Sequence, residues 1–219
     1  MSGRPIRQVR SSKALAPLVA SGLRIGLMGG SFNPPHAGHK LVAETALKRL
    51  ALDQLWWVVS PGNPLKELSG LPSQQQRMDA CGTFATGWRM RVTGFEKALG
   101  TPYTVEMLAF LRARYPDVRF VWVMGADNLA SLHRWRNWRE IARCVPMAVI
   151  DRPGWRMKAI ASPAGRLLGR FMVRSEKASR IAEMRPPAWV LIASRLSPLS
   201  STAMRNAAAE RTQFLNQLK

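Results

Sequence analysis

The sequence predicts an α/β fold, with a doubly wound, mainly parallel sheet and helices on both faces. From Leu23 onward, short β-rich runs alternate with longer helix-compatible segments, an order typical of this class. The run VRFVWVM at residues 118–124 is almost continuously apolar, as expected of a strand buried on both faces of a parallel sheet. The chain has 219 residues, 47% of them hydrophobic, which suits one domain with a substantial core.

The first half of the chain predicts three strands and three helices. The run RIGLM at residues 24–28 is the first strand, and a helix follows over residues 37–52. The second strand covers residues 54–59 and includes Trp56 and Trp57, which favour strands. A helix over residues 73–85, a strand over 89–93 and a helix over 104–114 come next, and Thr104 is expected to cap the last of them.

The second half continues the alternation with one interruption. After a turn at Pro116 and Asp117, the strand 118–124 precedes helical segments near Leu129 and over residues 138–143, and then a strand over 145–150. Residues 151–187 are expected to be irregular, followed by a strand over 188–192 and one or two helices over 200–218. Right-handed crossovers between these strands predict a Rossmann-like topology, in which ligands bind at the carboxyl ends of the strands.

Residues 1–21 are predicted to be a basic, disordered extension, and residues 22–219 the domain itself. The apolar stretch at residues 14–20 resembles part of a secretion signal, but it is short and contains Pro17, so secretion is the less favoured interpretation. The first cations of the chain precede every acidic residue: Arg4, Arg7, Arg10, Lys13 and Arg24.

Composition narrows the classes of function. Cys81 and Cys144 form no C-x-x-C pair, which argues against zinc or redox chemistry and favours a reducing, cytoplasmic setting. The sequence lacks a run of about 18 uncharged apolar residues, which a membrane span needs. An excess of 33 basic over 13 acidic residues gives a net charge of +20 and implies anionic partners. Because a solvated basic surface accounts for most of these cations, nucleic acid is a less favoured partner than a phosphorylated small molecule.

The segment GGSFNPPHAGH at residues 29–39 lies between the first strand and a helix, where this fold places a mononucleotide site. Gly29 and Gly30 are expected to let phosphate approach the backbone, and the helix N-terminus offers free N–H groups. His36 and His39, two of the three histidines in the chain, share one helix face. The segment is neither a P-loop nor G-x-G-x-x-G. The alternative is a helix start whose histidines make only structural hydrogen bonds.

This segment resembles the H-x-G-H signature of the nucleotidyltransferase superfamily, and the rest of the chain resembles bacterial nicotinate-nucleotide adenylyltransferases. The resemblance covers the chain from about Leu23 to Leu218. Ser31, Asn33, Pro102 and Met107 depart from the residues usual in that family. The further matching segments are Asn63-Pro64-Leu65-Lys66, Arg77-Met78, Tyr103-Thr104, Gly125-Ala126-Asp127, Trp135 and Ser200-Ser201-Thr202-Ala203-Met204-Arg205.

The resemblance implies transfer of the adenylyl group of ATP to nicotinate mononucleotide. It implies that His36 and His39 are catalytic donors to the phosphates, and that Tyr103, Thr104 and Trp135 bind the nicotinate nucleotide. Mg²⁺ is the expected cofactor, bound mainly through ATP and pyrophosphate oxygens, so a metal site built from protein ligands is not expected. The residues expected to bind ATP and its phosphates are Gly29, Gly30, Ser31, Phe32, Lys66, Gly125, Asp127, Ser200, Ser201, Thr202 and Arg205.

Structural roles and other functions remain as alternatives. Ser200 to Thr202 would serve as a helix cap, Asp127 as a cap at a strand end, Trp135 as core and Lys66 as a solvated lysine. The rival functions are a phosphopantetheine adenylyltransferase, a fragment of a class I aminoacyl-tRNA synthetase, and a non-enzymatic basic RNA-binding module. A homo-oligomer is compatible with the sequence.

Overall fold

A computed structural model of the chain describes residues 16–62 and 71–194. Within this part, seven strands form one sheet in the order β3-β2-β1-β4-β5-β7-β6, and all neighbouring strands are parallel. The strands are β1 (Arg24–Gly30), β2 (Gln54–Val59), β3 (Met90–Thr93), β4 (Arg119–Gly125), β5 (Met147–Ile150), β6 (Met172–Val173) and β7 (Trp189–Ile192). The strand order reverses between β1 and β4, so the predicted doubly wound, parallel α/β fold is confirmed.

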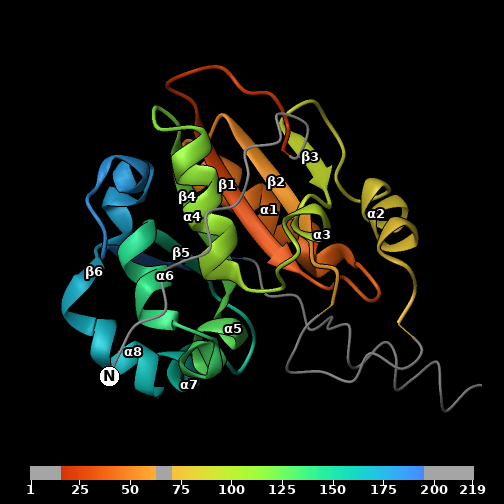
Figure 1. Ribbon diagram of the computed structural model, residues 1–219. Helices are drawn as coiled ribbons and strands as arrows, with labels where there is room; N and C mark the ends of the chain where they lie inside the picture. Colours follow the sequence, from red (N-terminus) through yellow and green to blue (C-terminus); the bar gives the residue numbers. More distant parts are fainter. Residues whose placement is uncertain (1–15, 63–70, 195–219) are drawn as a thin grey trace, which may run out of the picture.

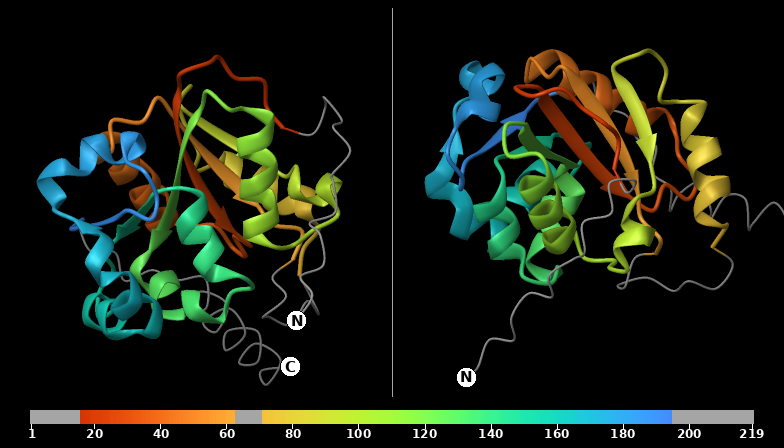
Figure 2. Two further views of the ribbon diagram at one scale, coloured as in Figure 1. Left: turned by 60° about the vertical axis from the view of Figure 1, so that its left-hand side comes forward. Right: turned by 45° about the horizontal axis from the view of Figure 1, so that its top comes forward.

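Helices connect the strands and cover both faces of the sheet (Figure 1). In the two views of Figure 2, α4 (Thr104–Arg114) and α1 (Ala37–Arg49) lie on opposite faces. None of the helices in the described residues is long and apolar enough to cross a membrane. The other helical segments are α2 (Gln74–Gly82), α3 (Glu96–Leu99), α5 (Ala126–Ser131), η1 (Leu132–Arg134), α6 (Trp138–Cys144), α7 (Arg156–Ala161), α8 (Pro163–Leu168), η2 (Gly169–Phe171) and η3 (Ser175–Glu183).

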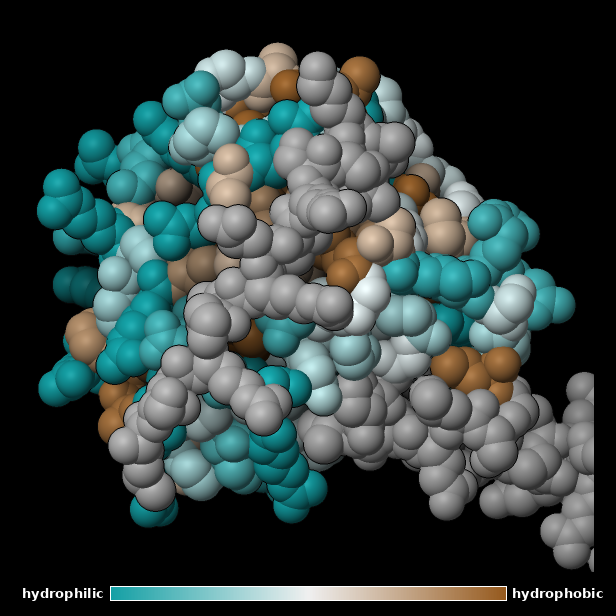
Figure 3. All heavy atoms as spheres, in the orientation of Figure 1, coloured by the Kyte–Doolittle hydropathy of each residue, from teal (hydrophilic) through white to brown (hydrophobic). Residues whose placement is uncertain are grey.

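Alternating side chains of the strands build two cores. In β4, Phe120, Trp122 and Met124 belong to the core that also contains buried residues of α4, α5 and α6. Val121 and Val123 belong to the opposite core, with residues of α1 and η3. This arrangement explains why the sequence of β4 is apolar at every position but its first. Hydrophilic residues cover most of the outer rim in Figure 3, where the hydrophobic residues form separate small groups.

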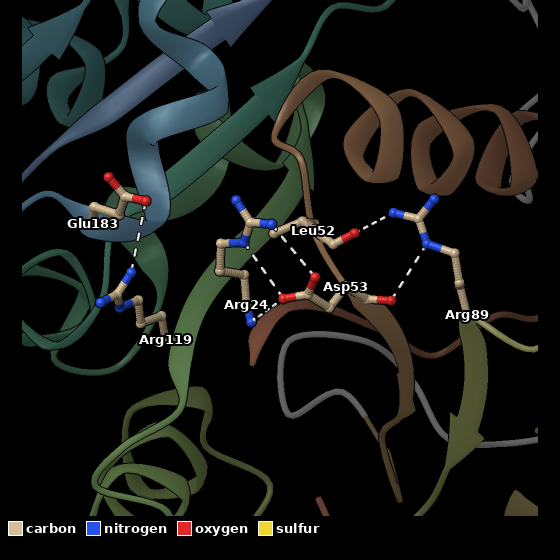
Figure 4. Close-up of polar contacts among 6 residues, drawn as sticks. All are labelled: Arg24, Leu52, Asp53, Arg89, Arg119 and Glu183. Carbon is tan, nitrogen blue, oxygen red and sulfur yellow. Dashed lines mark hydrogen bonds and ion pairs between the residues drawn. The ribbon is translucent and has the colours of Figure 1, made fainter. Parts of the chain in front are cut away.

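A cluster of hydrogen bonds joins the amino ends of β1, β2 and β3 (Figure 4). The Asp53 carboxylate accepts a hydrogen bond from the backbone N–H of Arg24 at 2.7 Å and two from its guanidinium at 3.4 Å. Arg89, just before β3, donates to the carbonyl oxygens of Leu52 and Asp53. These contacts fix the end of the sheet that faces away from the carboxyl ends of the strands.

The region after β5 corrects one prediction. Residues 151–187 are not irregular, because α7, α8, η2, β6 and η3 all lie there. Helices α7 and α8 have six residues each, which is less than two turns and too short for a readable apolar periodicity. The predicted helix over 37–52 ends at Arg49, and Ala51 takes a positive φ of 49°. The helices predicted over 200–218 lie outside the described residues.

The predicted extension, residues 1–21, lies partly within the described part of the chain. Ala16 and Val19 pack against the core that also contains buried residues of α4. The hydroxyl of Tyr115 donates a hydrogen bond to the carbonyl oxygen of Pro17 at 2.8 Å. The chain therefore contacts the domain before the predicted boundary at residue 22, while residues 1–15 lie outside the described part.

Candidate active site

A cavity of about 450 Å³ opens at the carboxyl ends of β1 and β4, where the strand order reverses. Its volume suits a ligand of nucleotide size, since such sites measure about 300–1,000 Å³. Lys66, Ser200, Ser201, Thr202 and Arg205 lie outside the described residues. Every other predicted site residue lines the cavity: Gly29, Gly30, Ser31, Phe32, His36, His39, Tyr103, Thr104, Gly125, Asp127 and Trp135.

The two histidines of the H-x-G-H segment form the start of α1. His36 is the N-cap residue, and its Nδ1 accepts a hydrogen bond from the backbone N–H of Gly38 at 3.1 Å. The backbone N–H of His36 donates in turn to Nδ1 of His39 at 3.3 Å, and the two ring centroids are 3.9 Å apart. Because each Nδ1 accepts a hydrogen bond, each neutral ring carries its proton on Nε2. The pair therefore offers two Nε2–H donors to an anion in the cavity.

His36 remains uncharged at neutral pH. Its side chain is only 2% exposed. This burial, and next the positive charge of Arg152, lower the pKa of His36 to about 4, while Asp127 opposes the shift. The donor that His36 supplies is thus a neutral imidazole.

Gly29 and Gly30 have a packing role that the sequence did not predict. A Cβ at Gly29 would collide with the ring of Trp122, and one at Gly30 would lie 3.2 Å from Cζ of Phe32. The Phe32 ring in turn packs edge-on against His39, with centroids 5.0 Å apart. Gly29 thus makes room for the ring of Trp122, and Gly30 for the Phe32 ring that packs against His39. The approach of phosphate to the backbone of the two glycines stays a prediction.

The N-terminus of α4 forms one end of the cavity. Tyr103 is its N-cap residue but makes no side-chain cap, so in the described residues the N–H groups of Thr104 and Val105 have no partner. Trp135 lines the same cavity and lies edge-on to Trp122, with ring centroids 6.3 Å apart. Free N–H groups and an indole ring in one cavity suit an aromatic ligand that carries an anionic group.

Asp127 also lines the cavity, at the point where β4 meets α5. Its Oδ2 accepts a hydrogen bond from Nη1 of Arg152 at 3.0 Å. Its Oδ1 is buried and has no hydrogen-bond partner among the described residues. A Cβ at Gly125 would touch this oxygen, so Gly125 leaves room for the carboxylate. A buried acceptor without a donor suits a ligand hydroxyl such as that of a ribose.

Known proteins resemble this chain over most of its length. A family model described as cytidylyltransferase-like matches residues 27–207. The probable nicotinate-nucleotide adenylyltransferase of Agrobacterium fabrum (strain C58 / ATCC 33970) is 53% identical over 182 residues, which are 83% of this chain and 97% of that protein. The corresponding protein of Rhizobium meliloti (strain 1021) is 52% identical over 185 residues, 84% of this chain and 98% of that protein. The chain belongs to the nicotinate-nucleotide adenylyltransferase family.

The fold also matches a solved structure, "Plasmodium falciparum nicotinic acid mononucleotide adenylyltransferase complexed with NaAD". The TM-score is 0.64 at 16% identity, and the match covers 84% of this chain and 83% of that one. At this identity the likeness concerns the fold alone. The family membership predicted from the motifs is confirmed by the sequence comparisons.

Arg77 matches a basic residue of the adenylyltransferase family. In this chain it positions the loops around the cavity. It is 2% exposed. Its guanidinium donates to the carbonyl oxygens of Ser31 at 2.7 Å, Ser60 at 2.8 Å and Pro72 at 3.0 Å. These bonds join the loops that follow β1 and β2 to the start of α2. Arg77 thereby holds the wall of the cavity in place.

Sequence reasoning missed several residues that line the cavity. Arg152 lies two positions after the end of β5 and Glu96 three positions after the end of β3, so the rule that ligands bind at the carboxyl ends of parallel strands would have found both. Arg134 and Arg136 flank Trp135, and Arg136 lies 4.4 Å over the ring of Tyr103. The sequence does not distinguish these two arginines as site residues, because most arginines of this basic chain are surface residues.

Proposed function

We propose that the protein transfers the adenylyl group of ATP to nicotinate mononucleotide, forming nicotinate adenine dinucleotide and pyrophosphate. The observation that carries this proposal is that one cavity contains the paired histidines, the open N-terminus of α4 together with Trp135, and the buried Oδ1 of Asp127. These three features suit a phosphate chain, a pyridine carboxylate and a ribose hydroxyl. The use of ATP favours a cytoplasmic location.

The reaction needs positioning and charge stabilisation more than a protein nucleophile. A 5′-phosphate oxygen of the acceptor attacks the α-phosphorus of ATP. A new P–O bond forms, and the bond to the β-phosphate oxygen breaks with its electron pair leaving on pyrophosphate. The Nε2–H groups of His36 and His39 would donate to the oxygens on which charge increases, and the cavity would hold the two polyanions in line. Arg152 adds positive charge beside them.

We propose Mg²⁺ as the cofactor. The described residues contain no group of three or more His, Cys, Asp or Glu side chains placed to hold a metal ion. In this proposal the ion enters with the triphosphate and is held by phosphate oxygens and water. When bound, the ion would neutralise charge on the departing pyrophosphate.

The N-terminus of α4 favours the acid over the amide acceptor. A carboxylate accepts charge-assisted hydrogen bonds from the Thr104 and Val105 N–H groups, whereas an amide is a weaker acceptor and turns an unmatched NH₂ toward donors. An unmatched buried polar contact costs about 1–3 kcal/mol. The expected preference for nicotinate over nicotinamide mononucleotide is therefore roughly ten- to hundredfold in kcat/KM.

The test measures kcat/KM with ATP, Mg²⁺ and each of three acceptors: nicotinate mononucleotide, nicotinamide mononucleotide and phosphopantetheine. Products are identified by mass. Trp135→Ala should weaken the binding of both pyridine acceptors equally and leave the KM for ATP nearly unchanged. Trp88→Ala, at an exposed tryptophan, is the matched control. Turnover of phosphopantetheine, or equal use of acid and amide, would contradict the proposal. RNA binding without ATP turnover would favour the basic RNA-binding module.

A further inference from the structure

One carboxyl group of the cavity has no task in the steps above. Glu96 is the first residue of α3, three positions after the end of β3, and is only 4% exposed. It lines the cavity together with Pro102, Tyr103 and Thr104. Within the described part of the chain its carboxyl group has no hydrogen bond or ion pair, and burial is the only influence on its pKa. A buried carboxyl without a partner, at the wall of a ligand cavity, is free to bind the ligand.

The position of Glu96 places it with the acceptor and away from ATP. Tyr103 and Thr104 belong to the end of the cavity that suits the pyridine carboxylate. Asp127 and Arg152 follow β4 and β5, which are separated from β3 by β2 and β1 in the sheet, and the Asp127 carboxylate suits the ribose of ATP. Glu96 therefore faces the nucleotide that brings both a carboxylate and a phosphate into the site.

The charge of that nucleotide decides which form of Glu96 can bind it. An ionised Glu96 would repel the acceptor in a place with little water to screen the repulsion. A protonated Glu96 carries an O–H group, which donates a strong hydrogen bond to an anionic oxygen. Burial raises the pKa of Glu96 to about 7, so the protonated form is present at neutral pH before any ligand arrives. The other ionisable side chains among the described residues of the cavity are His36, His39, Tyr103, Asp127, Arg134, Arg136 and Arg152, and none of them accounts for this shift.

We propose that Glu96 is a specificity residue for the acceptor, which it contacts as an uncharged carboxylic acid that donates a hydrogen bond to the nicotinate nucleotide. This inference rests on the proposed function. It adds a donor that is present only while Glu96 is protonated, unlike the backbone N–H groups of α4. The enzyme should therefore lose affinity for its acceptor as the pH rises through 7.

The expected size of the effect follows from the protonated fraction. Only that fraction binds, so the KM for nicotinate mononucleotide should be about tenfold higher at pH 8 than at pH 6 in the wild-type enzyme. The KM for ATP should change much less. The phosphate of the acceptor also titrates, near pH 6, but it does so equally in every variant. The ratio of wild type to variant at each pH therefore isolates Glu96.

The experiment measures the KM for nicotinate mononucleotide and for ATP between pH 6 and 8.5 in the wild type, Glu96→Gln and Glu96→Ala. The Gln side chain donates at every pH, so Glu96→Gln should keep the low KM of the wild type at pH 6 and lose the rise above pH 7. Glu96→Ala should show a KM raised about tenfold at all pH values. Glu106→Gln, in the first turn of α4 but outside the cavity, is the matched control and should keep the wild-type profile.

Two results would overturn the inference. One is a wild-type acceptor KM that rises above pH 7 no more than that of Glu96→Gln. The other is a Glu96→Gln enzyme as weak as Glu96→Ala at pH 6, which would show that Glu96 acts as an acceptor or a structural group. Thermal melting of each variant separates misfolding from lost binding, and the near-isosteric Gln variant keeps the test valid if the Ala variant is unstable. Failure of the wild type to adenylate nicotinate mononucleotide would instead reject the proposed function itself.

Discussion

His36 performs two tasks at one position, since it caps α1 through Nδ1 and offers Nε2–H to the cavity. We predict that His39→Ala and His36→Asn each lower turnover by about two to three orders of magnitude, as loss of one transition-state donor does. Asparagine is a good N-cap residue, so His36→Asn should retain the stability of the helix, whereas His36→Ala should also cost about 1 kcal/mol. Steady-state kinetics and chemical denaturation measure the two effects. Near-wild-type turnover in both variants would reject the catalytic assignment.

The buried state of His36 also predicts how stability depends on pH. Its pKa falls from 6.5 in the unfolded chain to about 4 in the folded protein, mainly through burial. The unfolded state therefore binds the proton more tightly, and the folded state loses stability as the pH falls from 6.5 to 4. At pH 5 the loss should be about 2 kcal/mol relative to pH 7.5. Because Glu96 and other groups titrate as well, the measurement is the difference in unfolding free energy between wild type and His36→Asn at the two pH values. A difference that does not change with pH would contradict the prediction.

Among single residues, the sequence predicted the role of those whose partners lie in the same short segment. His36 and His39 stand three positions apart in a motif, so their shared face followed from helix geometry. Glu96 and Arg152 have their meaning only because separate strands end at the same cavity. The contact between Gly29 and Trp122 joins two strands 93 positions apart, and no local pattern reports it.

Among the elements, α2 depends on one side chain for its position. Arg77 bonds to carbonyl oxygens of the loops after β1 and β2, and these partly buried acceptors would lose their donor in Arg77→Met. We predict a loss of about 2–4 kcal/mol in the free energy of unfolding, because each unsatisfied buried group costs about 1–3 kcal/mol. Denaturant titration measures the loss. The KM for ATP should rise in parallel, because the loop with Ser31 is no longer held.

A matched variant separates this effect from a general loss of charge. Arg91 is an exposed arginine of β3, and Arg91→Met should change the free energy of unfolding by no more than about 0.5 kcal/mol. Equal destabilisation by the two substitutions would show that Arg77 has no special role.

The elements differ in how readily the sequence revealed them. Strand β4 was predicted well because seven consecutive residues form it and both of its faces are buried. Helices α7 and α8 were missed because each is too short to show a period, and the bond from Trp189 Nε1 to the carbonyl oxygen of Leu168 shows that tertiary contacts hold this region in place. A helix that is stabilised mainly by contacts with distant residues shows little periodic pattern in its own sequence.

For the molecule as a whole, the boundary of the domain is a testable feature. Deletion of residues 1–15 should leave adenylation and stability unchanged, because these residues contain no motif of the reaction. Deletion of residues 1–20 should lower the melting temperature by several degrees, because Ala16 and Val19 leave the core and Tyr115 loses its bond to Pro17. Calorimetry and turnover of the two truncated proteins make the comparison. Equal melting temperatures would show that residues 16–20 contribute nothing to the fold.

The two outer strands affect how copies of the protein meet in solution. Within the described residues the sheet ends at β3, with four residues, and at β6, with only two. Open edges expose unpaired backbone groups on which strands of other molecules can assemble. Here the edges are short and carry the exposed cations Arg91, Arg170 and Arg174 on or beside them. Like charges at both edges repel approaching copies, so we expect the arginines there to disfavour aggregation through the sheet edges at high concentration.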